Sequence, residues 1–316
     1  MSKPVSYLPD GSYNYSASLY GEEPSKTLAL SAGGIFTLLF IFHIVQAVQF
    51  KTRYLIAAII SAFMEALGYG MRYKSIDDPF NVNGYAGQQG MIILAPVLLA
   101  ASQYVVLEKI ILQIGESASP IRASLIAKIF VACDVLSFAI QGAGSGILVS
   151  SVQHYTMGTN ILIGGLIIQV ISYASFLTTA LVVYSRGKKL NDEEEWRRMF
   201  QALFTGAILV MIRSVFRVIE FAMGYNGPIA TNEKFMYVFD FGLVAGAMLL
   251  FNIFHPGKLL RSAPASKITR DVESAQNPPA RFVEMESLGP YHQQRPDQER
   301  TISNNTIAAS EFYKKI

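Results

Sequence analysis

Cysteine is almost absent from this chain of 316 residues, which contains only Cys133. A single thiol excludes an intrachain disulfide, and it excludes a zinc site built from paired cysteines. Charged residues are also scarce, at 16%, whereas 51% of the residues are hydrophobic and the mean hydropathy is +0.33. This balance excludes a soluble enzyme and favours a membrane protein.

Motifs for catalysis and for energy coupling are also missing from the sequence. It has no Walker A loop, so the chain by itself offers no site for ATP-driven pumping. It has no nucleophile elbow, and its four histidines are too scattered for a zinc hydrolase: His43, His154, His255 and His292. We therefore expect no catalysis, no cofactor, no metal and no nucleic-acid partner.

Long apolar runs follow one another between residues 27 and 256. Each has about 20 to 26 residues, which suffices for a helix to cross a hydrocarbon core of roughly 30 Å. We place seven spans at Thr27–Gln49, Tyr54–Tyr73, Gln89–Leu112, Ser124–Leu148, Asn160–Tyr184, Met199–Met223 and Phe235–Phe254. The sequence thus predicts an all-α, polytopic membrane protein with seven transmembrane helices in residues 27–256.

Positive charges beside the spans predict the orientation of the chain. Twelve Lys and Arg residues flank the spans on one side: Lys51, Arg53, Arg122, Arg186, Lys188, Lys189, Arg197, Arg198, Lys258, Arg261, Lys267 and Arg270. The other side has Lys26, Arg72, Lys74 and Lys234. Because positive residues concentrate on the cytoplasmic side, we expect the N-terminus outside and the C-terminus in the cytoplasm.

Polar segments flank the predicted membrane domain. Residues 1–26 lack the zones of a cleavable signal peptide, and we expect them to form an extracellular tail. The sequon at Asn14 lies in this tail and is a candidate glycosylation site. Residues 257–316 are rich in Ser, Pro, Gln and mixed charge, which predicts a disordered cytoplasmic tail. Solvation alone or regulatory phosphorylation would explain such a tail.

Ionisable residues inside the spans are the strongest functional signal, because a charge in the bilayer costs several kcal/mol unless it is paired or faces a cavity. Six of them fall in the predicted outer half of the membrane: Glu65, Arg72, Arg213, Arg217, Glu220 and Asp240. Arg213, Arg217 and Glu220 are four and three residues apart, so they share one helix face. Three acids balance three bases, and we expect the six to pair with one another.

A second polar stripe lies on the predicted fourth span. It consists of Asp134 and Gln141, seven residues apart, and Gln169 of the fifth span is a candidate neighbour. These two residues and the six charges are our candidates for substrate binding. A network that only fixes the packing of the helices is the competing interpretation, because polar contacts between membrane helices often contribute only about 0.6 kcal/mol each.

Four further residues carry expectations about packing. Gly142 and Gly146 have the spacing that allows two helix backbones to approach closely. Pro96 predicts a bend in the third span that frees backbone carbonyls. Trp196 precedes Arg197 and Arg198 at the start of the sixth span, which is typical of an anchor at the membrane interface.

The order of these residues resembles the fungal lipid-translocating exporter family of seven-span proteins. Its members include 7-aminocholesterol resistance proteins, a sphingoid long-chain-base exporter and a protoporphyrin uptake protein. The matching segments are Glu65-x-x-Gly68-Tyr69-x-x-Arg72; Ala95-Pro96 with Ala100, Ala101 and Tyr104; Asp134 followed by Gln141-Gly142 and Gly144; Gly165 with Gln169; Arg213-Ser214-x-Phe216-Arg217-x-x-Glu220; and Glu233, Tyr237, Asp240 and His255-Pro256. Each segment is short, but the ordered set across six spans is specific.

The resemblance implies a transporter or translocator of amphipathic, lipid-like compounds in a fungal membrane, with a role in drug resistance or lipid asymmetry. We expect the plasma membrane as its location, and membrane lipids and an amphipathic small molecule as its partners. If the substrate is a sphingoid base, Glu65, Glu220 or Asp240 is a candidate acceptor for the amine. Whether such proteins transport directly or regulate transport by others stays open.

A seven-span receptor or sensor that regulates lipid or stress responses is the alternative. Against it, the third span ends in Leu107-Glu108-Lys109 instead of Asp/Glu-Arg-Tyr, and the last span lacks Asn-Pro-x-x-Tyr. A retinal protein is disfavoured because the seventh span contains no lysine for a Schiff base.

Overall fold

The computed structural model describes residues 7–8, 10, 12–150, 154–191, 193–224 and 227–260, and all of them belong to one compact unit. Within these residues the regular secondary structure is helical, apart from one isolated bridge between Tyr7 and Tyr13. The predicted all-α class is therefore confirmed. The predicted C-terminal tail lies outside the described residues, except for positions 257–260.

Seven helices in the described part are long and apolar enough to cross a membrane, as predicted. The first six are α1 Lys26–Phe50, α2 Ile56–Ser75, α3 Val82–Ile114, α4 Ala123–Ser150, α5 Tyr155–Leu190 and α6 Glu194–Met223. The seventh consists of α7 Glu233–Met236, the π-helical segment Tyr237–Gly242 and α8 Leu243–Ile253, and it is followed by the short α9 Pro256–Leu259.

Several helices extend beyond the predicted spans. α3 begins at Val82 instead of Gln89, and α5 continues to Leu190 instead of Tyr184. At the start of α3, the side chain of Asn81 accepts a hydrogen bond from the Gly84 N–H at 3.1 Å. Such a cap stabilises polar helical turns outside the apolar core, so hydropathy alone places these ends too early or too late.

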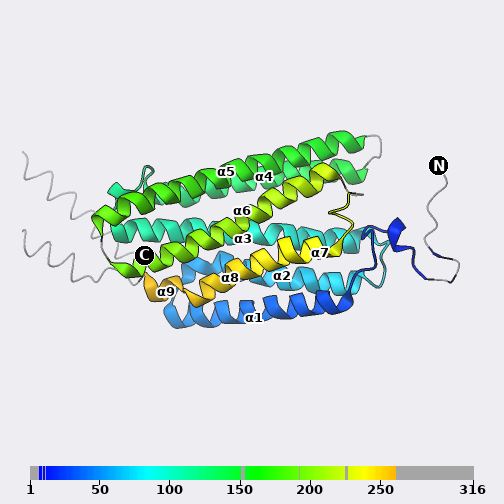
Figure 1. Ribbon diagram of the computed structural model, residues 1–316, viewed down its shortest axis with the longest axis horizontal. Coiled ribbons are helices and arrows are strands. Elements are labelled where there is room, and N and C mark those ends of the chain that lie inside the picture. The colour runs from blue at the N-terminus through cyan, green and yellow to red at the C-terminus, as the bar shows by residue number, and fades with distance from the viewer. Residues whose placement is uncertain are drawn as a thin grey trace, which may run out of the picture. The chain divides into compact units, whose positions relative to one another are not determined.

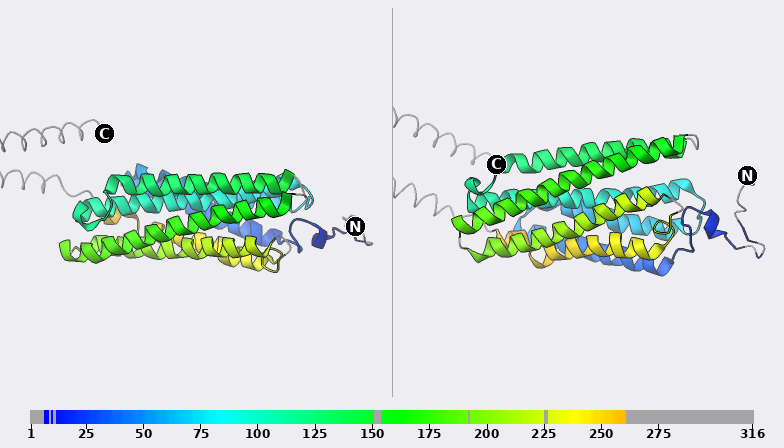
Figure 2. Two further views of the ribbon diagram at one scale, coloured as in Figure 1. Left: turned by 90° about the horizontal axis from the view of Figure 1, so that it is seen from above. Right: turned by 45° about the horizontal axis from the view of Figure 1, so that its top comes forward.

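The helices form one bundle with α3 at its centre (Figure 1). α3 packs against α2, α4 and α6, and α4 and α5 pack against each other as an antiparallel hairpin. On the other side of α3, α1 packs against α2 and α8, and α8 packs against α6. The two views of Figure 2 show the same arrangement, with the α4–α5 hairpin on one flank of the bundle.

An aromatic cluster fills the space between α3, α4 and α5. It consists of Tyr104, Phe130, Tyr173 and Phe176, and the ring centres of contacting pairs are 4.6 to 6.1 Å apart. All four side chains are buried. The hydroxyls of Tyr104 and Tyr173 donate hydrogen bonds to Asp134 and Gln103, so these rings are held by polar contacts as well as by packing.

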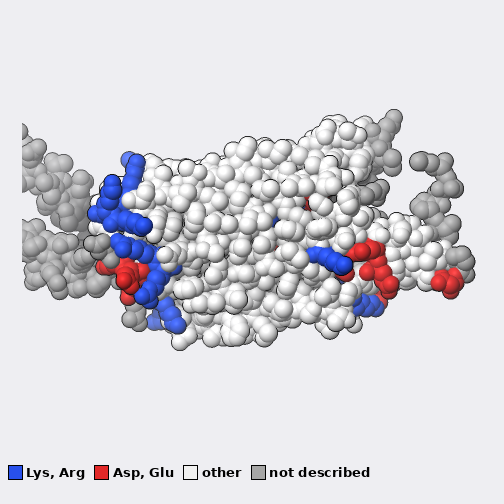
Figure 3. Space-filling view, viewed as in Figure 1, with Lys and Arg blue, Asp and Glu red and all other residues white. Residues whose placement is uncertain are grey.

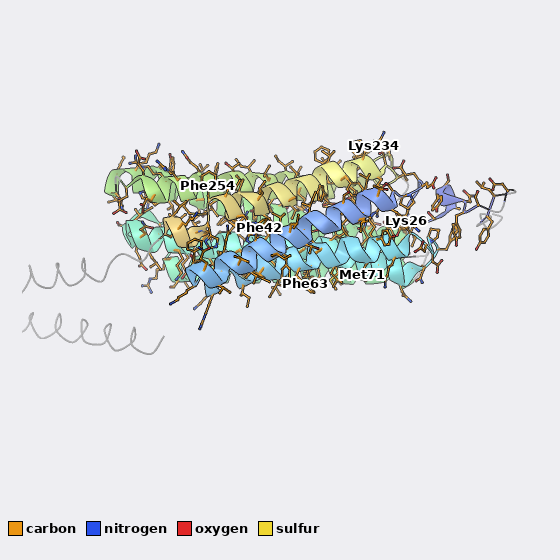
Figure 4. All side chains as sticks on the ribbon, turned by 90° about the horizontal axis from the view of Figure 1, so that it is seen from below. Lys26, Phe42, Phe63, Met71, Lys234 and Phe254 are labelled. Carbon is orange, nitrogen blue, oxygen red and sulfur yellow. The ribbon has the colours of Figure 1, made fainter. Side chains whose placement is uncertain are left out.

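Charged side chains gather at the two ends of the bundle, and the face seen in Figure 3 is almost free of them in between. Large apolar side chains cover this middle zone: Phe42 is 56% exposed and Phe63 is 48% exposed. Figure 4 shows both on the outside of the helices, with Lys26 and Lys234 together at one end. This distribution is that of a multi-pass membrane protein surrounded by lipid.

Asn14 provides a test of the predicted orientation. It precedes a 3₁₀ turn, Tyr15–Ala17, and the hydroxyl of neighbouring Tyr13 donates to the Asp77 carbonyl at 3.2 Å in the α2–α3 connection. The segment therefore lies at the end of the bundle that we assign to the outside. In a eukaryotic host we expect a glycosidase-sensitive mobility shift that Asn14→Gln removes and Asn304→Gln does not; the reverse pattern would contradict the predicted orientation.

The glycines that let α4 and α5 approach each other are not the predicted ones. A Cβ atom on Gly144 would lie 2.6 Å from the amide nitrogen of Leu162 and 2.8 Å from the carbonyl oxygen of Gly158. A Cβ atom on Gly142 or Gly146 would meet nothing within 4 Å among the described residues. The predicted pair is therefore wrong, because the spacing identified a stripe of small residues without showing which face meets α5.

Trp196 is also placed differently from the prediction. Its side chain is 0% exposed, its ring lies 5.9 Å from that of Tyr184, and its indole nitrogen donates to the Asn191 carbonyl at 3.3 Å. Because α6 already begins at Glu194, Trp196 lies in its first turn and faces α5. It closes the contact between these two helices and is not an interfacial anchor.

Candidate functional site

Two arginines of α6 share one carboxylate in the interior of the bundle. Arg213 Nε lies 2.9 Å from Asp240 Oδ1, and Arg217 Nε donates to the same oxygen at 3.0 Å. A second guanidinium nitrogen of Arg217 lies 3.0 Å from Glu220. The side chains of Arg213, Arg217 and Asp240 are at most 6% exposed. The predicted grouping of these four residues is therefore found, with Asp240 at its centre.

The π-helical segment Tyr237–Gly242 carries Asp240 to this position. A π-helical turn holds an extra residue and is wider than an α-helical turn, and such turns often occur at functional sites. The sequence reveals the acid but not the widened turn, because the apolar pattern of residues 235–254 is also compatible with a regular α-helix.

Pro96 supplies a further partner for Arg213. Because proline has no N–H, the carbonyl of Ile92, four residues earlier in α3, loses its helical donor. A guanidinium nitrogen of Arg213 donates to this carbonyl at 3.2 Å. In the same stretch Ser61 of α2 donates to the Ala95 carbonyl at 2.5 Å. The carbonyl that Pro96 leaves without a helical donor thus accepts a hydrogen bond from Arg213, a member of the charge network.

The other two predicted charges, Arg72 and Glu65, do not form ion pairs with α6. Arg72 pairs with Glu233 at the start of α7, at 2.6 Å, and its guanidinium lies 5.1 Å from the centre of the Tyr20 ring. Glu65 is 2% exposed, and no side-chain hydrogen bond or ion pair reaches it from the residues that the structure describes. The predicted pairing is therefore wrong for Arg72, because its partner Glu233 lies just before the predicted seventh span. Glu65 has no ion pair, but it lies close enough to Arg213 and Arg217 to interact with them electrostatically.

Asp134 and Gln141 form two separate contacts away from the charge network. The hydroxyl of Tyr104 donates to Asp134 at 2.7 Å, which joins α3 to α4. The amide of Gln141 donates to Gln169 at 3.0 Å, which joins α4 to α5 and confirms the predicted neighbour. Neither residue lines the pocket described next, so their contacts hold helices together.

A pocket of about 540 Å³ lies beside the charge network, at the end of the bundle where α7 begins. Of the predicted site residues, Arg72, Arg217 and Glu220 line it. Much of the remaining wall is apolar or aromatic and comes from α3, α5, α6 and α7: Val82, Tyr85, Ile93, Tyr155, Phe221 and Met236. The pocket thus combines paired charges with an apolar surface.

Two acids of this region were not among the predicted site residues. Glu22 and Glu233 both line the pocket, and the carboxylate of Glu22 accepts a hydrogen bond from the Glu233 N–H. Glu22 lies in the predicted tail, where hydropathy gives no signal. With these two included, five carboxylates stand against three guanidinium groups, a formal excess of two negative charges.

Comparison with known proteins connects this arrangement to a family. Residues 58–263 match the family model described as RTA1 like protein. This match contains the whole charge network from Glu65 to Asp240 and leaves out the N-terminal segment. No solved structure matches the chain.

Three fungal relatives illustrate the similarity. Protein RTA1 of Saccharomyces cerevisiae is 31% identical over 188 residues, and the match covers 58% of this chain and only 59% of that relative. Probable lipid transporter atnI of Emericella nidulans is 27% identical, with 80% of this chain and 70% of the relative covered. Sphingoid long-chain base transporter RSB1 of S. cerevisiae is 25% identical, with 77% and 74% covered. Since the family model matches more than half of its length, the chain belongs to the RTA1-like protein family.

Proposed function

We propose that the protein binds amphipathic, lipid-like compounds in the pocket beside Glu220 and transports them in a fungal plasma membrane, which contributes to resistance or to lipid asymmetry. One observation carries the proposal: the same pocket is lined by buried charged groups and by an apolar wall. An amphipathic molecule requires both, because its head group needs polar partners while its chain is stabilised by apolar contact.

The charges of the pocket favour a cationic head group. Arg72 and Arg217 are already paired with Glu233 and Asp240, so neither guanidinium calls for an additional anion. Glu220 lines the pocket, and its side chain is 14% exposed. Of the three acids considered from the sequence, it is the only one among the pocket-lining residues. An amine of a long-chain base would form a charge-assisted hydrogen bond with this carboxylate.

The relatives support transport rather than catalysis. Two of them are named as transporters, one of lipids and one of sphingoid long-chain bases. In the described part of the chain, no group of three or more His, Cys, Asp and Glu side chains is placed to hold a metal ion. A non-enzymatic role, with movement driven by a gradient or by another protein, follows as part of the proposal.

Expression in a fungal host tests the proposal as a whole. Strains that lack or overproduce the protein are scored for growth on sphingoid bases, aminosterols and azoles, and the export of a labelled long-chain base is measured directly. Overproduction should raise resistance and export together. Unchanged resistance and unchanged flux at normal abundance would contradict transport.

Glu220→Gln tests the assigned head-group acceptor. We expect the purified protein in nanodiscs to bind a long-chain amine about tenfold more weakly, because a hydrogen bond to a charged group contributes about 1.5 to 3 kcal/mol. Glu194→Gln is the matched control, since Glu194 is exposed and pairs with Arg198 within α6 at 3.0 Å. Normal binding by Glu220→Gln would remove the assignment, and loss of folded protein would favour a packing role.

A further inference from the structure

The segment that precedes α1 forms part of the pocket wall. Leu19, Tyr20, Glu22 and Pro24 all line the pocket, although the family match begins only at position 58. The pocket wall therefore combines residues inside the matched range with residues that precede it. The residues before α1 can therefore influence which of several related ligands the pocket binds.

Contacts with the connection before α7 hold this segment in place. The Ser25 N–H donates to Glu233 at 2.9 Å, and the Glu233 N–H donates to Glu22. Gly21 has a φ of +74°, and a Cβ atom there would lie 2.8 Å from the Cβ of Thr231. Glycine is therefore required both by the backbone conformation and by the close approach. The wall is fixed at several points on the residues that begin the seventh span.

Tyr20 is the residue of this wall that contacts a charge. Its side chain is 7% exposed, its hydroxyl accepts a hydrogen bond from Gln88 at 3.0 Å, and its ring meets that of Tyr85 edge-on at 5.2 Å. The guanidinium of Arg72 lies over the face of the Tyr20 ring at 5.1 Å, while Glu233 pairs with the same guanidinium at 2.6 Å.

We propose that Tyr20 determines the head-group selectivity of the pocket by covering Arg72. A phosphate or carboxylate head group binds best to an uncovered guanidinium, which offers it two parallel N–H donors. The aromatic ring occupies one face of that group and attracts its positive charge, so an anionic head group has to displace both Tyr20 and Glu233. An amine meets less competition, because Glu220 lines the pocket and Arg217 donates only to its Oε2. This inference rests on the proposed function and adds the discrimination against anionic amphiphiles.

Binding of two probes to the full-length protein in nanodiscs tests this role. The probes are dodecylamine and dodecyl phosphate with the same fluorescent label, and the readout is the ratio of their dissociation constants. We expect Tyr20→Leu, which keeps apolar volume but has no aromatic face, to lower the preference for the amine about tenfold, mainly through tighter binding of the phosphate. Tyr20→Phe should retain most of the preference. Tyr13→Leu is the matched control, because its ring packs near Phe80 and does not line the pocket.

A second variant tests the same role if the Tyr20→Leu protein does not fold. Gln88→Leu removes the hydrogen bond that holds the Tyr20 hydroxyl and should shift the ratio in the same direction by a smaller factor. A wild-type protein that binds neither probe would overturn the proposed function together with this inference. A wild-type preference for the amine that persists unchanged in Tyr20→Leu, or in Gln88→Leu if the former does not fold, would overturn only the role of Tyr20.

Discussion

Asp240→Asn is expected to abolish the accumulation of folded protein. Asp240 is the carboxylate that Arg213 and Arg217 share, and all three side chains are buried. Asparagine keeps the shape of the side chain but removes the ion-pair partner of Arg213 and leaves Arg217 with Glu220 alone. Removing one partner of a buried ion pair costs about 3 to 5 kcal/mol, which is comparable with the whole stability of many proteins. Size-exclusion chromatography of a fluorescent fusion and the thermal midpoint in detergent measure the effect.

Asp77→Asn is the matched control for this prediction. Asp77 also pairs with a base, Lys26, but its side chain is 62% exposed at the end of the bundle, so we expect wild-type accumulation. Adding Arg213→Met to Asp240→Asn should recover part of the lost protein, because the guanidinium that lost its ion-pair partner is removed. Normal accumulation of Asp240→Asn would show that the central carboxylate is not needed for packing.

The results for Asp240→Asn and Glu220→Gln together distinguish a packing role of the charged residues from a role in substrate binding. The structure divides them by position: Asp240 and Arg213 are buried in the network, whereas Glu220 lines the pocket. We therefore expect substitutions at Asp240 to remove protein and substitutions at Glu220 to remove ligand binding. A structural role and a functional role are then carried by neighbouring residues of one network.

Gly144→Ala is expected to lower the thermal midpoint strongly through one added methyl group. The new Cβ atom would lie 2.6 Å from the Leu162 amide nitrogen and 2.8 Å from the Gly158 carbonyl oxygen, which are backbone atoms of α5. Backbone cannot move aside as a side chain can, so α4 and α5 would have to separate along their contact. Overpacking of this kind costs typically 1 to 3 kcal/mol and occasionally more.

Gly142→Ala and Gly146→Ala provide controls of the same chemistry on the same helix. Among the described residues, nothing lies within 4 Å of a Cβ atom at either position. Because alanine favours a helix over glycine by up to about 1 kcal/mol, these variants should match or exceed the wild-type thermal midpoint. Equal destabilisation by all three substitutions would contradict the contact at Gly144.

The membrane fold was predictable because its main signal is local. Apolar length identifies each span, and the spacing of Arg213, Arg217 and Glu220 places them on one face wherever α6 packs. The pairing of Arg72 was not predictable, since its partner Glu233 lies beyond the apolar limit of the seventh span. Hydropathy measures the lipid-exposed core and carries no information about a polar turn that continues the same helix.

The remaining differences concern relations between segments. Small residues at 142, 144 and 146 form one pattern, and only the rotation of α4 against α5 decides that Gly144 makes the contact. The contact between Tyr20 and Arg72 could not be predicted for a similar reason. The polar segment that contains Tyr20 has no periodic pattern from which its position against α2 could be inferred. The sequence contains the partners, but their register is fixed by packing across the bundle.

The aromatic cluster between α3, α4 and α5 fills the interior of the bundle beyond the pocket, and none of its four residues lines the pocket itself. Along α3, Tyr104 lies about 18 Å from Ile92, the last carbonyl that the charge network uses, at 1.5 Å per residue. A head group that advanced from the pocket would meet rings whose hydroxyls already bond Asp134 and Gln103. For the proposed transport, passage between α3, α4 and α5 would require these rings to separate, and their two hydrogen bonds would have to break.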